Sequence, residues 1–177
     1  QHGFFTLPST VLQKSRGDNK QILEKFFNEN NINRSIVKPA NGGSSIGVFS
    51  VSNIGEALEK TNLLFSKQMD TRVVVEPFAE GIEFTIIILE NRFGLPVALP
   101  PTEIETDYTE HQIFDFRKKY LPTHQVIWHC PPRFSKTAIE KIQAQAEQLF
   151  ALFGTRDFSR FDGWVLKDGN ICFCDFN

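Results

Sequence analysis

The sequence lacks an excess of charge of either sign, a long apolar run and a set of cysteines that could pair completely. Lys and Arg number 19 against 21 Asp and Glu, so the net charge of −2 offers no basic field to attract nucleic acid or anionic lipid. No run of about 18 apolar residues and no basic-then-apolar leader is present, so we predict neither a membrane span nor a signal peptide. The three cysteines argue against a disulfide framework and for a reducing compartment, the cytoplasm.

The chain contains enough apolar material for one or two compact lobes. It has 177 residues, of which 41% are hydrophobic and 23% charged. It begins at Gln1 without a methionine and ends at Asn177 inside an extended pattern, so we expect a fragment of a longer product.

Periodicity and capping residues predict three helices. Apolar residues near Ile22 and Phe26 follow a helical spacing over residues 19–30. Asn53 is a plausible N-cap for a helix to about Lys67, and Ser135 for a helix that ends near Gly154.

The segments between the helices predict strands and one long loop. Apolar, β-branched runs predict strands over residues 35–38, 46–51, 72–76 and 82–90, and two more at the end of the chain. Residues 96–101 are expected to break regular structure. Residues 101–134 show no sustained period, so we expect a long functional loop with brief extended pieces.

The last two strands bring acidic residues together. If Asp168-Gly169 is a two-residue turn, Lys167 faces Asn170 and Asp162 faces Asp175. Like charges directly opposite each other are unfavourable unless something neutralises them. Either a hard divalent cation, magnesium or manganese, binds there, or a Lys or Arg pairs with one carboxylate; spacing leaves both readings open.

The same register adds two neighbours to this pair. Arg160 then faces Asn177, and because side chains alternate along a strand, both project from the face that carries the two carboxylates. Cys172 and Cys174, two residues apart, are likewise expected to share one face.

Lys38 precedes a loop of small residues. The glycines between Asn41 and Gly47 allow close backbone approach to a phosphate, and Ser44 and Ser45 add hydroxyl donors. It is not a Walker loop, because its lysine comes before the glycines. An ordinary hairpin connection is the alternative.

Two further segments can each be interpreted either as part of a binding site or as an ordinary solvated segment. Residues 76–81 followed by Glu83 either offer hydrogen-bonding groups to a purine and a ribose or form a solvated turn. Residues 114–120 are either a lid with a phosphate-binding lysine or a solvated loop pinned by two rings. His111, His124 and His129 have no metal-ligand spacing.

Taken in order, these segments resemble one family. SIVKPANGGSSIGVFSV, VVVEPFAEGIEFTIIIL, FDFRKKYLP and SRFDGWVLKDGNICFCDFN are similar to the ATP-grasp domain of D-alanine–D-alanine ligases. The resemblance implies an α+β ATP-grasp fold with two mixed or antiparallel lobes, residues 1–79 and 80–177, and a nucleotide site between them.

The resemblance also implies ATP as substrate and two magnesium or manganese ions. The residues it assigns are Lys38, Lys119 and Ser45 at the phosphates; Glu76, Phe78 and Ala79 at the adenine; Glu83 at the ribose; Asp162, Asp175 and Asn177 at the metals; Arg160 at the oxyanion; and Ser44 and Tyr120 at the first D-alanine. Family members are commonly dimers, which makes a homodimer an expectation here.

The implied reaction joins two D-alanines through an acylphosphate for peptidoglycan precursor synthesis. Tyr120 favours D-alanine over D-lactate and leaves D-serine open. Asp175 stands where the family usually has Glu, and Phe114 and Phe116 replace tyrosines. The alternatives are another ATP-grasp carboxylate–amine ligase and a nucleotide-binding module without catalysis, and the fragment itself is expected to be inactive.

Overall fold

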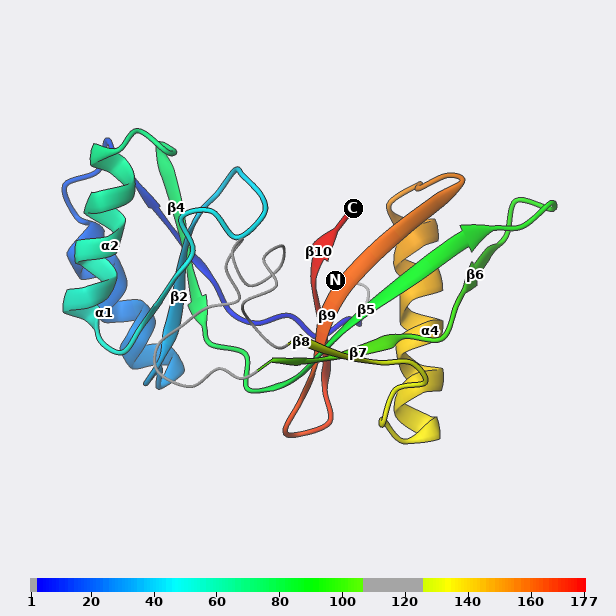
Figure 1. Cartoon of the computed structure of the whole chain (residues 1–177). Coiled ribbons are helices and arrows are strands. Elements are labelled where there is room, and N and C mark those ends of the chain that lie inside the picture. The colour runs from blue at the N-terminus through cyan, green and yellow to red at the C-terminus, as the bar shows by residue number, and fades with distance from the viewer. Residues whose placement is uncertain (1–2, 107–125) are drawn as a thin grey trace. The chain divides into compact units, whose positions relative to one another are not determined.

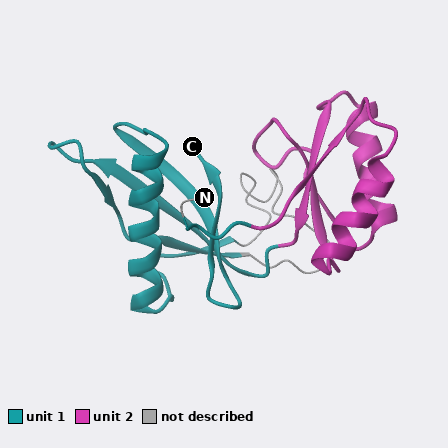
Figure 2. Cartoon of the chain, turned by 180° about the vertical axis from the view of Figure 1, so that it is seen from behind, with its two compact units in different colours: residues 1–6, 79–106, 126–177 teal, residues 7–78, 107–125 magenta. Residues whose placement is uncertain are grey.

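The computed structural model describes residues 3–106 and 126–177, which form two compact units (Figures 1 and 2). Among these residues, unit 1 comprises 3–6, 79–106 and 126–177, and unit 2 comprises 7–78. No helix in the described ranges is long and apolar enough to cross a membrane.

Unit 2 is a four-stranded antiparallel sheet with two helices on one face (Figure 1). The strand order is β1-β4-β2-β3. The core between sheet and helices contains Leu23, Phe27, Val37 and Leu64, all with less than a tenth of their surface exposed. Its elements are β1 (Thr10–Gln13), α1 (Asn19–Asn30), β2 (Ser35–Pro39), β3 (Phe49–Val51), α2 (Ile54–Ser66) and β4 (Arg72–Pro77).

Unit 1 is a six-stranded antiparallel sheet covered on one face by a single helix, α4. The strand order is β10-β9-β5-β7-β8, and β6 also pairs with β5. Phe84, Ile88 and Phe161 from the sheet pack against Ile142 of α4. The elements are β5 (Gly81–Glu90), β6 (Pro96–Ala98), β7 (Thr102–Thr106), β8 (Val126–His129), α4 (Lys136–Leu152), β9 (Phe158–Leu166) and β10 (Ile171–Phe176).

The three predicted helices are confirmed, and two of the expected caps are present. The Asn53 side chain accepts a hydrogen bond from the Glu56 amide at 2.9 Å, and Ser135 accepts one from the Ala138 amide at 3.2 Å. Both bonds satisfy amides that lack a partner inside the helix. Local signals of this kind fix helix starts well.

Two predictions about strands were wrong, and one strand was not predicted. Pro96–Ala98 pairs with β5 instead of breaking regular structure, because a proline is tolerated at the first residue of an edge strand. The strand predicted from Ile46 begins only at Phe49, since Ile46 and Gly47 lie in a turn. The short strand Thr10–Gln13 was not predicted.

The two units differ from the expected lobes, residues 1–79 and 80–177, mainly in where the start of the chain belongs. Residues 3–6 lie in unit 1, where Phe4 packs against the core and Phe5 forms an isolated bridge with Cys172. The change between the two units otherwise comes at Phe78 and Ala79.

Candidate functional site

The hairpin of β9 and β10 turns through three residues, 167–169. The Leu166 amide donates to the Asn170 carbonyl at 2.8 Å, and the Gly169 amide donates to the Leu166 carbonyl at 2.9 Å. Gly169 takes the left-handed conformation, φ 81°, that a three-residue hairpin loop needs at this position. The predicted two-residue turn, with Lys167 facing Asn170, is therefore wrong.

A β-bulge in β10, just before Asp175, restores the register that the sequence predicts for the acidic pair. Phe173 faces Gly163, but Asp175 faces Asp162, so Cys174 is the extra residue on its strand. The predicted pairing of the two aspartates is confirmed because the bulge compensates for the longer turn. Cys172 is buried, whereas Cys174, the extra residue of the bulge, is exposed, so the two thiols lie in different environments.

The second predicted pairing is also present. Arg160 and Asn177 exchange two backbone hydrogen bonds, each of 2.9 Å. Residues opposite each other in an antiparallel pair project from the same face. The arginine and the asparagine therefore lie on the face that carries Asp162 and Asp175.

This face points away from α4. On β5, Thr85 lies opposite Asp162, while the alternate residue Phe84 is buried in the core against the helix. Glu83 is half-buried on the same side as Thr85. We call Glu83, Thr85, Arg160, Asp162, Asp175 and Asn177 the polar face of unit 1.

Asp162 is nearly buried and has a close basic partner. Its Oδ1 accepts from Thr85 Oγ1 at 2.7 Å and from Arg160 Nε at 3.1 Å, and its Oδ2 accepts from Arg160 Nη2 at 3.1 Å. The carboxylate is thus already neutralised on one side. The two facing aspartates therefore need a cation less than the sequence predicts, because Arg160 compensates one of the two charges.

Asp175 is the second aspartate of the polar face and is exposed. Its Oδ1 accepts the amide of Phe176 at 3.0 Å. Two aspartates and one arginine leave this part of the face with one uncompensated negative charge. A cation would therefore still be attracted to it.

The donor set fits a hard divalent cation. A carboxylate oxygen accepts about two hydrogen bonds, so Asp162 Oδ2, which has one donor, keeps a lone pair. Asp175 and the amide oxygen of Asn177 would complete an all-oxygen set, the kind that magnesium and manganese prefer. Within residues 3–106 and 126–177 no cluster of three or more His, Cys, Asp and Glu side chains could hold a metal, so the site depends on two carboxylates and one amide.

In unit 2 the structure brings two predicted nucleotide-binding residues together. Lys38 Nζ lies 2.5 Å from Glu76 Oε1, and about a quarter to a third of each side chain is exposed. Ile36 of β2 faces Glu76 on β4, so Lys38 is its diagonal neighbour. The pair holds the lysine on the sheet directly before the Gly/Ser loop.

The Gly/Ser loop has an unusual backbone. Ser44 and Ser45 both take left-handed conformations, with φ of 54° and 57°. Gly47, at φ 76°, packs so closely that an added Cβ would lie 2.8 Å from Met69 Cε. The loop is thus held in a specific conformation, with Ser44 exposed and Ser45 half-buried.

Asp70 anchors the start of this loop. Its Oδ2 accepts the backbone amide and side-chain amide of Asn41 at 2.7 and 3.0 Å, and its Oδ1 accepts the amides of Thr71 and Arg72 at 2.6 and 3.0 Å. Hydrogen bonds from the Arg72 amide and then from Asn41 and Thr71 lower the pKa of Asp70, against the opposing effect of burial. No sequence pattern predicts this contact, because Asp70 and Asn41 are 29 residues apart.

We expect Asp70→Asn to lower the unfolding temperature at neutral pH and to do so less in acid. A carboxylate whose folded pKa is depressed stabilises the fold above its unfolded pKa, about 3.9, and loses that contribution as the pH falls through the folded pKa. Thermal unfolding of both proteins between pH 7 and pH 3 tests this. A difference that stays constant over that range would contradict the assigned role.

Phe78, expected at the adenine, is held by an arginine that the sequence analysis missed. The Arg34 guanidinium lies 3.8 Å from the centroid of the Phe78 ring, and the Arg34 carbonyl accepts the Phe78 amide at 2.9 Å. Arg34 Nε also donates to Ser50 at 2.8 Å. These contacts fix the end of β4 and leave Ala79 half-buried.

The family model described as D-ala D-ala ligase C-terminus matches residues 2–177 of this sequence. The chain belongs to the D-alanine–D-alanine ligase family. It is 31% identical over 176 residues to the D-alanine–D-alanine ligase of Pseudoalteromonas translucida and 36% identical over 144 residues to that of Idiomarina loihiensis. These matches cover 99% and 77% of the chain, and 52% and 43% of the relatives, so the chain spans about half of their length.

Solved structures of this ligase family share the fold. VanG D-Ala:D-Ser ligase from Enterococcus faecalis superposes with a TM-score of 0.79 at 23% identity, over 99% of the chain and 48% of that protein. D-alanyl-alanine synthetase A from Vibrio cholerae gives 0.81 at 20% identity, over 98% and 50%. The predicted α+β, ATP-grasp fold is confirmed.

Two residues that the ligase resemblance assigns, Lys119 and Tyr120, lie outside the described residues, as does the rest of the segment 114–120. The other assigned positions are distributed over both units. Lys38, Ser44, Ser45, Glu76 and Phe78 lie in unit 2, and Ala79, Glu83, Arg160, Asp162, Asp175 and Asn177 lie in unit 1.

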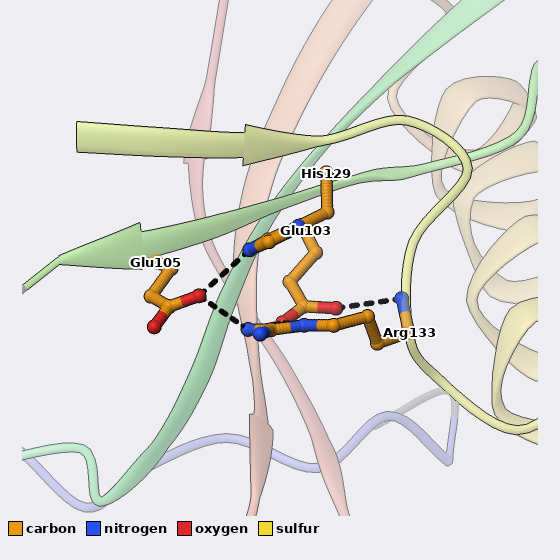
Figure 3. Close-up of polar contacts among 4 residues, drawn as sticks. All are labelled: Glu103, Glu105, His129 and Arg133. Carbon is orange, nitrogen blue, oxygen red and sulfur yellow. Dashed lines mark hydrogen bonds and ion pairs between the residues drawn. The ribbon is translucent and has the colours of Figure 1, made fainter.

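A second polar cluster lies on the helix side of the unit 1 sheet (Figure 3). Glu103, only 1% exposed, accepts from the Arg133 amide at 2.7 Å and from its guanidinium at 2.8 and 2.5 Å. Arg133 also pairs with Glu105 at 2.7 Å, and His129 Nε2 lies 2.7 Å from the same Glu105 oxygen. Glu103 faces Phe84, a core residue, so this cluster joins β7, β8 and the segment before α4 and is separate from the polar face.

Proposed function

We propose that this chain supplies the ATP- and magnesium-binding part of a D-alanine–D-alanine ligase that serves peptidoglycan precursor synthesis. The observation that carries the proposal is the pairing of Asp175 with Asp162, beside Arg160 and Asn177, on one face of unit 1. Membership of the family implies small-molecule substrates and the use of ATP. We further propose that units 2 and 1 are the central and C-terminal lobes of the ATP-grasp fold, and that the enzyme acts in the cytoplasm.

The residue roles follow the resemblance and the contacts. Lys38, Ser45 and Lys119 would bind the nucleotide phosphates; Glu76, Phe78 and Ala79 the adenine; Glu83 the ribose; and Ser44 and Tyr120 the first D-alanine. The Lys38–Glu76 pair supports the first two roles, since it holds both side chains on one side of the sheet before binding. Asp162, Asp175 and Asn177 would hold two magnesium ions.

The proposed reaction has two steps on small molecules. The carboxylate of one D-alanine attacks the γ-phosphate of ATP, which gives an acylphosphate and releases ADP. The amine of a second D-alanine then attacks the acyl carbon, which forms the amide bond and releases phosphate and a proton. Magnesium, when bound, would neutralise charge on the phosphate oxygens. Lys38 and Lys119 would align the phosphates, and Arg160 would stabilise the negative oxygen that develops in the second step.

Arg160 is suited to that task because its ion pair with Asp162 uses only some of its N–H groups. The fork to Asp162 uses Nε and Nη2 and fixes the plane of the guanidinium. About half of the Arg160 side chain is exposed. Its remaining N–H groups can therefore reach a ligand without breaking the ion pair.

Lys38→Ala is expected to weaken ATP binding in the presence of magnesium by about tenfold or more, because one charge-assisted contact to phosphate is lost. Calorimetric titration of the purified chain measures this. Lys25→Ala, a change at an exposed lysine of α1, is the matched control and should bind like the unmodified chain. Equal affinities of all three proteins would remove Lys38 from the site.

Phosphate release by the complete gene product tests the reaction itself. We expect release from ATP with D-alanine and none with L-alanine. Release that does not depend on D-alanine would favour another ATP-grasp carboxylate–amine ligase. Nucleotide binding without release under any of these conditions would favour a non-catalytic module. D-serine belongs among the tested acceptors, because one solved structure with this fold is a D-Ala:D-Ser ligase.

A further inference from the structure

A threonine that no sequence motif singled out bonds directly to the buried aspartate of the polar face. Thr85 of β5 lies opposite Asp162 of β9, and its Oγ1 donates to Asp162 Oδ1 at 2.7 Å. The two residues are 77 positions apart in the chain and are joined only by the pairing of their strands. The bond is thus built into the sheet of unit 1.

The two carboxylate oxygens of Asp162 accept different numbers of hydrogen bonds. Oδ1 receives Thr85 Oγ1 and Arg160 Nε, which fills its capacity of about two hydrogen bonds. Oδ2 receives Arg160 Nη2 alone. Only Oδ2 therefore keeps a lone pair for another ligand.

Thr85 and Arg160 hold the carboxylate from two strands. Arg160 reaches Asp162 from two positions earlier on β9, and Thr85 reaches it from β5. A β-branched side chain has few rotamers, so the strand itself sets the direction of the Thr85 hydroxyl. Rotation of the carboxylate would break a bond on one side or the other.

We propose that Thr85 is a positioning residue for the cation site: it fixes the plane of the Asp162 carboxylate so that Oδ2 is the oxygen presented to the cation. This inference rests on the proposed function, because it assumes that Asp162 binds the cation. Partners that orient metal-binding side chains affect metal affinity by about tenfold to a hundredfold. Thr85 acts through Asp162 and need not touch the cation.

The test measures cation binding without turnover. Manganese, alone and with ADP, is titrated into the purified chain, and free manganese is followed by electron paramagnetic resonance. Thr85→Val removes the hydroxyl and keeps the branched shape, whereas Thr85→Ser keeps the hydroxyl. Thr102→Val is the matched control, because Thr102 of β7 lies opposite Thr85 on the other side of β5.

We expect Thr85→Val to raise the manganese Kd by about tenfold or more, Thr85→Ser to stay within about threefold of the unmodified chain, and Thr102→Val to leave the Kd unchanged. Circular dichroism checks that each variant is folded. Should the valine variant fail to fold, Thr85→Ala removes the hydroxyl with a smaller side chain and is expected to show the same loss.

The outcomes separate this inference from the proposed function. If the unmodified chain binds manganese and the folded valine or alanine variant binds it equally well, Thr85 has no positioning role and the inference fails alone. If the unmodified chain binds no manganese with or without ADP, the proposed cation site fails and the inference fails with it. Loss in the serine variant equal to that in valine would also overturn the role of the hydroxyl.

Discussion

Asp162→Asn is expected to remove most of the magnesium dependence of nucleotide binding, with at least about a tenfold loss of affinity when magnesium is present. The substitution removes one of the two facing aspartates of the β9–β10 hairpin. The charge of the remaining Asp175 is balanced by that of Arg160, so the hairpin would no longer attract a divalent cation strongly. Calorimetric titration of ATP into the variant, with magnesium and with chelator, gives the two affinities.

The fold should survive this change. Asparagine has the same shape as aspartate, and its amide oxygen can still accept from Thr85. Asp168→Asn is the matched control, because Asp168 lies in the loop of the same hairpin and bonds only to Asn170 within the described chain. An Asp162→Asn variant that keeps the full effect of magnesium would remove Asp162 from the cation site.

Arg133→Ala is expected to lower the unfolding temperature by roughly 5 °C or more at neutral pH, a larger loss of stability than for Asp70→Asn. The change removes the two guanidinium hydrogen bonds to the Glu103 carboxylate, which is only 1% exposed. The backbone amide of residue 133 remains, but the charge is lost. Thermal unfolding followed by circular dichroism measures the effect.

The pH dependence gives this prediction a second test. Burial raises the pKa of Glu103, but hydrogen bonds and charge from Arg133 outweigh it and hold the pKa below its ordinary value. In the unmodified chain the stabilisation is therefore present above the unfolded pKa, about 4.3, and lost as the pH falls through the folded pKa. In the variant, burial acts with less opposition, so Glu103 takes up a proton at higher pH and the cost of its charge disappears.

The difference in unfolding temperature between the two proteins should accordingly narrow on acidification. Arg16→Ala is a suitable control, because Arg16 pairs with Asp18 at the surface, with both side chains more than two fifths exposed, and such pairs contribute little. A difference that widens in acid, or an Arg133→Ala protein as stable as the control, would contradict the role assigned to the Glu103–Arg133 pair.

The sequence predicted the acidic pair correctly, although the turn has three residues and not the expected two, and the bulge was not predicted. Asp168-Gly169 is compatible with a two-residue and a three-residue loop, because both use a glycine in the left-handed region. The bulge at Cys174 carries no recognisable residue pattern. The longer turn and the bulge shift the register in opposite directions, so Asp175 still faces Asp162.

Helices were easier to predict than strands for a physical reason. Caps such as Asn53 and Ser135 act within three residues of the positions they stabilise, so the signal is local. The edge strands Thr10–Gln13 and Pro96–Ala98 are short, and their existence depends on a partner strand far away in the chain.

The same distinction explains which site residues were missed. Asp162 and Arg160, two apart on one strand, were both predicted on the polar face, and their ion pair follows from that spacing. Thr85 and Asp70 were not predicted, because each acts through a contact that only the assembled sheets create. The pairing of Lys38 with Glu76 likewise depends on the alignment of β2 with β4.

The most direct test of the account is calorimetric titration of the unmodified chain with ATP, once with magnesium and once with chelator. Two aspartates face each other, and Arg160 compensates only one of their two negative charges. The pair should therefore bind a cation together with the nucleotide, so we predict that ATP binds about tenfold more tightly, or better, with magnesium. Equal affinity in both solutions would contradict the central claim that this hairpin is a cation site.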